Sequence, residues 1–212
     1  MTTAKRNTIV LVMLISAFVA MLNQTILNTA LPAIIKGLNI TETTAQWLIT
    51  GFMLVNGVMI PLTAYLMDKV KTRPLYLGAM GTFLIGSIVA AIAPNFGVLM
   101  FARVIQAVGA GILMPLMQFT LFTLFSKEHR GFAMGLAGLV IQFAPAIGPT
   151  FTGLIIDNAS WRVPFIVIVG IALVTFIFGF VSISSYNTTK ETKLDKKSVI
   201  YSTLGFGLML YA

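Results

Sequence analysis

The hydrophobic residues of this chain fall into long blocks separated by short polar segments. A helix needs about 20 predominantly apolar residues to cross a bilayer, and six blocks have that length, with polar residues and prolines at their ends. We therefore predict six membrane-spanning helices, over residues 8–36, 46–67, 74–93, 96–125, 131–156 and 162–183.

The segments outside these blocks are expected to have different roles. Residues 1–7 carry two bases and are predicted to form a cytoplasmic tail. Residues 184–197 are polar, carry four lysines and are interpreted as a solvated cytoplasmic connector. Residues 198–212 are apolar again but too few to span a bilayer. We expect them to begin a seventh helix that is cut short, so the chain is interpreted as a fragment of a longer protein.

Two pairs of predicted helices carry matching proline motifs. Residues 28–32 in the first helix resemble residues 111–115 in the fourth, and residues 61–68 in the second resemble residues 149–157 in the fifth. Because three helices separate the copies, the second copy crosses the membrane in the opposite direction. Inverted repeats of this kind are typical of secondary transporters. The predicted fold class is an all-α integral membrane protein, in which residues 8–183 form a six-helix bundle of inverted three-helix repeats.

Composition supports the membrane assignment and argues against other classes. Hydrophobic residues make up 58% of the chain and charged residues 9%, which excludes a soluble globule. The net charge of +8 does not indicate nucleic-acid binding, because the bases are spread between apolar blocks instead of forming one basic face. The absence of cysteine excludes disulfides and thiolate metal sites. No nucleophile, base and orienting group converge in the sequence, so an enzyme is not expected.

The distribution of bases predicts the orientation of the bundle. Cytoplasmic loops of membrane proteins carry an excess of lysine and arginine. With the N-terminus in the cytoplasm, only Lys36 and Arg162 lie outside. Eleven bases then lie inside, namely Lys5, Arg6, Lys69, Lys71, Arg73, Lys127, Arg130, Lys190, Lys193, Lys196 and Lys197. We therefore expect a multi-pass protein of a cell membrane, most simply a bacterial plasma membrane, with a cytoplasmic N-terminus.

Two tryptophans and the single histidine lie near the ends of predicted helices. Trp47 and Trp161 are expected at the membrane–water interfaces, where tryptophan is enriched. His129 lies in the charged loop before the fifth helix and is expected to be solvated.

Arg103 is the single full charge within the fourth predicted helix. An arginine near the bilayer centre costs roughly 2.5 to 3.5 kcal/mol on insertion scales, so such residues normally face a bundle interior or a wet cavity. The same helix face carries Gln106, Met114 and Met117. One alternative is that the side chain extends along the helix to the headgroups. The other is that Arg103 lines a cavity and is held by Gln106 and by an amide of the first helix.

The first helix carries the amides that could meet this arginine. Gln24 and Asn28 are four residues apart and share a helix face. Pro32 has no N–H, so the carbonyl of Asn28 loses its usual helical partner. These features predict a bent, polar helix segment, and the alternative is that the amides only join neighbouring helices.

Four stretches of the chain together resemble the major facilitator superfamily, and more narrowly its fourteen-helix drug:proton antiporters, such as the EmrB, QacA and lincomycin-resistance exporters. They are residues 22–32, 64–73, 103–111 and 144–153. The resemblance implies a gating role for Asp68, Lys69 and Arg73 in the second stretch. In the third stretch it implies proton coupling by Arg103 with Gln106, and in the fourth it implies gating by a helix bend at Pro145, Gly148 and Pro149.

Some positions depart from the family motifs. Ala64, Lys71 and Thr72 differ from the loop signature, and Ala107, Ala144 and Thr152 each replace a glycine. Asn23 stands where most members of the group carry aspartate. With that change, no carboxylate of this sequence is expected at membrane depth, so the proton carrier would lie in the missing helices or the coupling would differ.

The function that the resemblance implies is export of amphipathic, often cationic drugs, driven by proton entry without a cofactor. The expected partners are the lipid bilayer, amphipathic drugs, protons and the remaining helices of a full-length transporter. A deformable apolar surface with a few amides suits loose substrate choice, and we expect it to be formed by Gln24, Asn28, Met114, Met117, Gln142 and Phe143. Two alternatives remain, a facilitator of one metabolite on the same fold and a non-transporting fragment that assembles with a partner.

Overall fold

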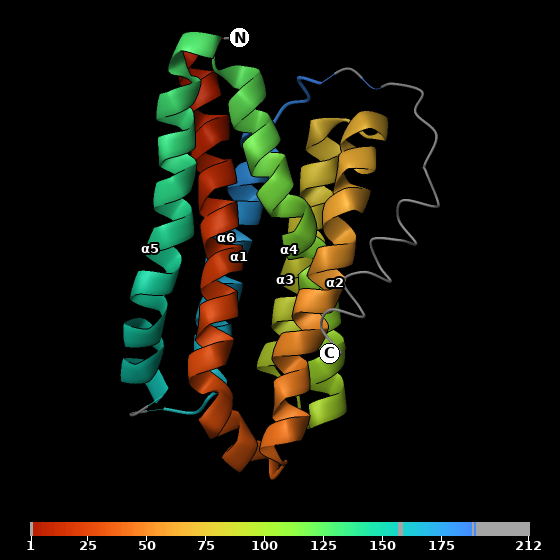
Figure 1. Ribbon diagram of the computed structural model, residues 1–212, viewed down its shortest axis with the longest axis vertical. Helices are drawn as coiled ribbons and strands as arrows, with labels where there is room; N and C mark the ends of the chain where they lie inside the picture. The colour runs from red at the N-terminus through yellow and green to blue at the C-terminus, as the bar shows by residue number, and fades with distance from the viewer. Residues whose placement is uncertain (1, 157–158, 188, 190–212) are drawn as a thin grey trace.

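The computed structural model describes residues 2–156, 159–187 and 189. Within these residues the chain folds into six α-helices and one short 3-10 helix (Figure 1). The bounds are α1 Thr3–Leu38, α2 Glu42–Lys69, α3 Thr72–Ala91, α4 Phe96–Leu124, η1 Lys127–His129, α5 Arg130–Ile156 and α6 Val163–Ser182. All six α-helices are long and apolar enough to cross a membrane, which confirms the predicted spans. The expected seventh helix and most of the connector lie outside the described residues.

Two helices, α1 and α2, begin a full turn or more earlier than the hydrophobic pattern predicts. α1 begins at Thr3 instead of residue 8, so most of the expected tail is helical, and α2 begins at Glu42 instead of residue 46. The side chains of Thr2 and Thr41 cap these helices by accepting hydrogen bonds from the backbone N–H groups of Lys5 and Thr44. Such caps satisfy N–H groups that have no partner within the helix. Hydropathy marks only the apolar part of a helix, whereas capping side chains determine where it starts.

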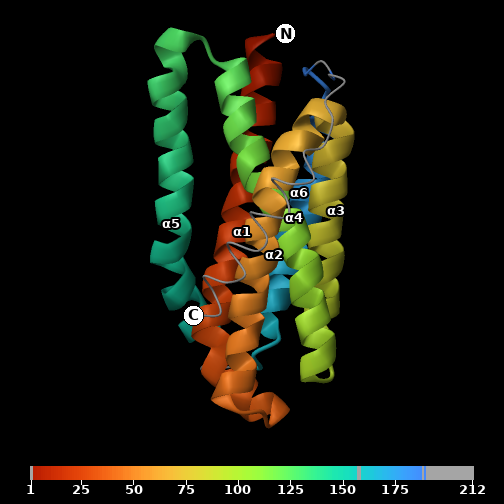
Figure 2. The same ribbon diagram turned by 45° about the vertical axis from the view of Figure 1, so that its right-hand side comes forward.

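The packing of the helices repeats with an internal symmetry. α4 packs on α2 as α1 packs on α5, and α3 packs on α4 as α6 packs on α1. Exchanging α1 with α4, α2 with α5 and α3 with α6 therefore maps the contacts onto themselves. In Figure 2, α5 stands at one side of the bundle next to α1, and α3 lies on the other side. This arrangement confirms the inverted three-helix repeats.

Small residues allow the closest of these helix contacts. A Cβ atom on Gly109 of α4 would lie 2.5 Å from the carbonyl oxygen of Ala79 and 2.8 Å from Cβ of Phe83, both in α3. Any side chain at Gly109 would push these helices apart, which is why small residues are enriched at helix interfaces in membranes. α1 continues as one helix through Pro32.

The two ends of the bundle differ in charge. The N-terminus, the α2–α3 turn, η1 and the end of α6 lie at one end (Figure 1). The described bases at that end are Lys5, Arg6, Lys69, Lys71, Arg73, Lys127 and Arg130, against Lys36 and Arg162 at the other. The four lysines of residues 190–197 lie outside the described part of the chain.

The two tryptophans do not behave alike. Trp47 is 53% exposed, as expected of an interfacial residue, but Trp161 is only 5% exposed. The indole of Trp161 packs edge-on against Phe165, and Cδ1 of the ring would lie 2.8 Å from a Cβ atom on Gly37. The glycine leaves room for the indole between α1 and α6, so Trp161 packs within the bundle at the start of α6. His129 is exposed and its Nδ1 lies 2.9 Å from Oγ of Ser126.

Candidate functional site

Arg103 is fully buried within the bundle, with 0% of its surface exposed. Nη1 donates to Oε1 of Gln106 over 2.9 Å, and Nε donates to the carbonyl oxygen of Leu48 over 3.4 Å. The guanidinium lies 4.1 Å from the ring centre of Phe52, in cation–π geometry. These contacts exclude the alternative in which Arg103 reaches the headgroups. In this conformation protein encloses the side chain completely.

Gln106 extends this contact into a network that joins four helices. Its Nε2 donates to Oδ1 of Asn23 over 3.3 Å and to Oγ of Ser87 over 3.0 Å. Asn23 belongs to α1, Ser87 to α3, and Leu48 belongs to α2. Asn23, Ser87 and Gln106 are all fully buried. We call these residues, with Arg103, the central polar network.

The amide of α1 that joins this network is not one of those expected from the sequence. Gln24 is half-buried and Asn28 is exposed, whereas Asn23 is completely buried. Adjacent residues of a helix point about 100° apart, so only one of Asn23 and Gln24 can face α4. The sequence could not identify it, because α1 has apolar residues on nearly all sides.

The central polar network contains no carboxylate among the described residues. The charge of Arg103 is instead balanced by an amide oxygen, a backbone carbonyl and an aromatic ring. Nδ2 of Asn23 is buried and has no hydrogen-bond partner. A buried donor left without a partner costs about 1 to 3 kcal/mol. The network therefore contains two unfavourable features, a buried positive charge and a buried amide nitrogen that donates no hydrogen bond.

The three predicted gating residues flank the α2–α3 turn, with Asp68 and Lys69 at the end of α2 and Arg73 at the start of α3. Asp68 is half-buried, and Lys69 and Arg73 are exposed. Nη2 of Arg73 donates to the carbonyl oxygen of Phe180 over 3.0 Å, and its guanidinium lies 5.4 Å from the Phe180 ring centre. Arg73 therefore joins α3 to the end of α6. Asp68 forms no salt bridge among the described residues.

The predicted gating segment of α5 packs against α1 through Gly148. Gly148 is buried, whereas Pro145 and Pro149 are exposed. A Cβ atom on Gly148 would lie 2.7 Å from Cβ of Thr25 and would overlap its hydroxyl oxygen as well. α5 and α1 therefore pack closely at Gly148.

The structure does not bring the six predicted substrate-contacting residues into one cavity. Met117 is fully buried in the core and Met114 is half-buried. Gln142 is exposed, and Phe143 is 58% exposed and lines a small apolar pocket with Phe18 and two α5 residues. In this conformation the set is divided between core and surface.

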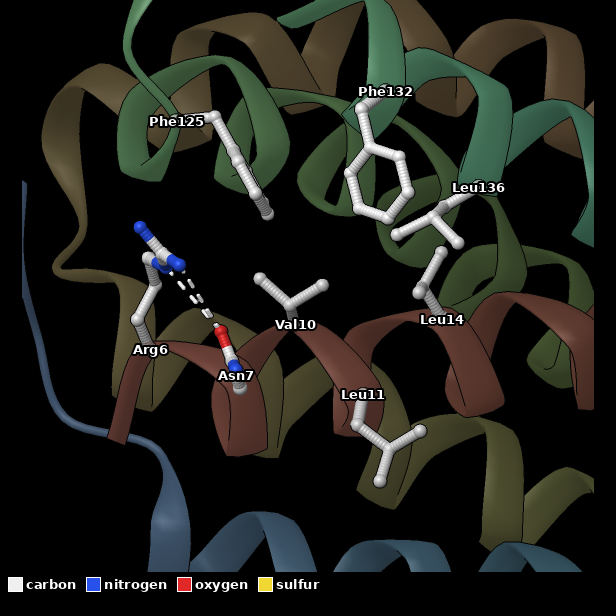
Figure 3. A pocket seen from close by; sticks show the side chains of 8 residues that line it. All are labelled: Arg6, Asn7, Val10, Leu11, Leu14, Phe125, Phe132 and Leu136. Atoms are coloured by element: carbon white, nitrogen blue, oxygen red, sulfur yellow. Dashed lines mark hydrogen bonds between the residues drawn. The ribbon is translucent and has the colours of Figure 1, made fainter. Parts of the chain in front are cut away.

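A further pocket, of about 350 Å³, lies at the basic end of the bundle and was not expected (Figure 3). It is lined by residues of α1, by Phe125 just after α4, and by residues of α5. Its walls are apolar apart from Arg6 and Asn7. Nε and Nη2 of Arg6 both donate to Oδ1 of Asn7 over 3.3 Å, and the guanidinium lies 4.9 Å from the Phe125 ring centre. No sequence motif could indicate this pocket, because three separate segments form it.

Comparison with known proteins gives consistent results. The family model described as Major Facilitator Superfamily matches residues 13–210. The "Uncharacterized MFS-type transporter YcnB" of Bacillus subtilis is 50% identical over 97% of the chain, which covers 44% of that protein. The "Lincomycin resistance protein LmrB" of the same species is 39% identical over 96% of the chain, covering 42% of LmrB. The "Probable multidrug resistance protein EmrY" of Escherichia coli is 31% identical over 91% of the chain, covering 38% of EmrY.

A solved structure shares the fold. The human organic anion transporter TETRAN superposes with a TM-score of 0.71 at 15% identity, over 85% of this chain and 48% of the transporter. The chain thus spans less than half the length of each of these proteins.

Proposed function

The chain belongs to the Major Facilitator Superfamily, and on that premise we propose that it forms the N-terminal half of a proton-coupled multidrug exporter. Relatives named for lincomycin resistance and multidrug resistance support a drug substrate. Among the observations on the chain itself, the buried central polar network carries the proposal. A charge that is fully enclosed at membrane depth is expensive to keep and usually marks an ion or substrate pathway.

The proposed role of Arg103 and Gln106 is to change the pKa of a proton-binding carboxylic acid. A buried cation lowers the pKa of a carboxylic acid that comes close to it and therefore promotes release of the proton. Since no described residue near Arg103 is a carboxylate, the acid would come from the remaining helices of the transporter. Movement of that acid toward and away from Arg103 would couple proton entry to drug export, with the proton gradient as the energy source and no cofactor.

The proposed drug-binding surface forms only when the remaining helices are present. Gln24, Asn28, Gln142 and Phe143 are half-buried or exposed and are free to contact another part of the transporter or a drug. Met114 and Met117 would contribute deformable apolar area if α4 shifts. Asp68, Lys69 and Arg73, with the α5 segment that contains Pro145, Gly148 and Pro149, would act as gates between the two sides.

The proposed orientation has a cytoplasmic N-terminus. Seven described bases lie at the end that contains the N-terminus and two lie at the other, which supports this orientation by the positive-inside rule. Single cysteines test it, because the chain has none of its own. With an impermeant thiol reagent on whole cells, Thr43→Cys should react and Lys71→Cys should react only after permeabilisation. Both positions are exposed, and the reverse pattern would overturn the orientation.

Transport itself is tested in inverted membrane vesicles that contain the complete transporter. An imposed proton gradient should drive uptake of several unrelated cationic dyes, and an uncoupler should abolish it. Arg103→Ala should remove the gradient-driven component at equal amounts of inserted protein. Transport of one metabolite alone would favour a facilitator, and no transport by a well-inserted protein would favour a non-transporting assembly.

A further inference from the structure

The α2–α3 turn has no capping side chain of its own at the start of α3. Only Val70 and Lys71 separate α2 from α3. The first N–H groups and the last carbonyls of a helix have no partner within it. Lys71 precedes α3 and makes no capping hydrogen bond, since an ammonium group has no acceptor. A side chain that caps the start of α3 therefore has to come from another part of the chain.

The side chain of Asn187 supplies them from the segment that follows α6. Its Oδ1 accepts from the backbone N of Thr72 over 2.7 Å and from Oγ1 of Thr72 over 2.8 Å. Its Nδ2 donates to the carbonyl oxygens of Met67 over 3.0 Å and Val70 over 3.1 Å. The oxygen faces donors and the nitrogen faces acceptors, so one amide caps the start of α3 and the end of α2 together.

Neighbouring contacts hold Asn187 in place. Oγ of Ser185 accepts from the backbone N of Arg73 over 3.3 Å. The hydroxyl of Tyr186 forms a hydrogen bond with Oγ1 of Thr120, near the end of α4. Three consecutive residues therefore bind the ends of three helices. Ser185 is exposed and Tyr186 and Asn187 are half-buried, so these residues of the predicted connector satisfy helix ends while they remain partly accessible.

We propose that Asn187 is a positioning residue for the α2–α3 turn, which rests on the gating role proposed above for Asp68, Lys69 and Arg73. The amide makes the ends of α2 and α3 and the segment after α6 move as one unit. Loss of the amide frees the turn from that segment and lowers the rate of transport. Drug binding stays unchanged, because Asn187 lies at the end of the bundle and contacts only helix ends.

Thiol labelling of the purified chain tests the double cap without requiring transport. The chain has no cysteine, so Val70→Cys reports on the end of α2 and Leu75→Cys, at a position 6% exposed, reports on the start of α3. Asn187→Ala should speed the labelling of both at least about tenfold, the effect of losing one or two ordinary hydrogen bonds. Asn187→Asp keeps the acceptor and loses the donor, so only the labelling of the α2 reporter should speed up.

Controls make each result decisive. Thr189→Ala, at an exposed position two residues away, should change neither labelling rate. Unchanged labelling of both reporters in the Asn187→Ala background would overturn the double cap. If that variant does not purify as a folded protein, Asn187→Asp and Ser185→Ala provide the test, and the double cap fails if Asn187→Asp leaves the α2 reporter unchanged.

Transport by the complete protein tests the positioning role. Asn187→Ala should lower kcat of gradient-driven dye transport several-fold and leave KM near that of the wild type. A general loss of folded protein would not lower kcat once the rate is divided by the amount of inserted protein. Unchanged kcat alongside faster labelling would overturn the positioning role. A wild-type protein that transports no dye would instead refute the proposed function, and the labelling result would still decide whether the cap exists.

Discussion

Gln106 donates its side-chain amide to Oδ1 of Asn23 over 3.3 Å and so joins α4 to α1 beside the buried guanidinium of Arg103. This contact leaves Nδ2 of Asn23 without a partner. Asn23, which is linked to Arg103 through Gln106, is thus a neutral amide. Among the described residues, no carboxylate pairs with the guanidinium of Arg103.

Replacing Asn23 by aspartate should stabilise the bundle. The new carboxylate keeps an acceptor for Gln106, removes the unused donor and brings a negative charge near Arg103. Removal of an unsatisfied buried donor contributes about 1 to 3 kcal/mol, so the thermal midpoint in detergent should rise at neutral pH. Asn28→Asp, at an exposed position on the same helix, serves as the control and should give no such rise. A lower midpoint for Asn23→Asp would mean that burial of the carboxylate outweighs its attraction to Arg103.

Replacing Arg103 by lysine should preserve insertion and remove most gradient-driven transport. An ammonium group cannot keep both hydrogen bonds in the planar arrangement that also stacks on Phe52. Arg103→Ala should lose all of it and also leave Oε1 of Gln106 without its donor. Dye transport in vesicles, normalised to inserted protein, measures both effects. Wild-type transport by the lysine variant would show that only a charge is needed at this position.

Bulk at Gly148 should separate α5 from α1. Gly148→Leu forces a side chain into Thr25, and overpacking of this kind typically costs about 1 to 3 kcal/mol. Gly138→Leu is the matched control, because a Cβ atom at Gly138 of the same helix meets nothing within 4 Å. Thermal unfolding in detergent should show a lower midpoint for the first variant only. Equal midpoints would mean that α1 and α5 separate freely.

The contact of Tyr186 with α4 should make the basic end sensitive to alkali. Burial raises the pKa of Tyr186 to about 12, an effect only partly offset by its hydrogen bond to Thr120. The folded state therefore favours the neutral phenol, and this stabilisation is complete below pH 10 and is lost as the pH rises to about 12. Labelling of a cysteine at Val70 should accelerate over that range, and Tyr186→Phe should remove the acceleration. An unchanged pH profile in Tyr186→Phe would assign the effect to another group.

The sequence by itself determined the number and order of the described membrane-spanning helices, and it limited Arg103 to the headgroups or the bundle interior. These follow from local energetics, because a backbone in lipid must satisfy its own hydrogen bonds and an isolated charge there must avoid the lipid. The proline motifs indicated the inverted repeats, and the motif resemblance indicated the superfamily that the comparisons confirm.

Tertiary structure alone decided which residues meet. Asn23 rather than Gln24 joins Gln106 across 83 positions, and Asn187 reaches Thr72 across 115 positions of the chain. Trp161 is buried because a glycine of α1 leaves room for its ring. Helices that are apolar on nearly all sides carry no pattern that defines an inner face, and a cap supplied by a distant residue leaves no local signal. Such contacts depend on how the helices pack, and that packing cannot be predicted from the local sequence.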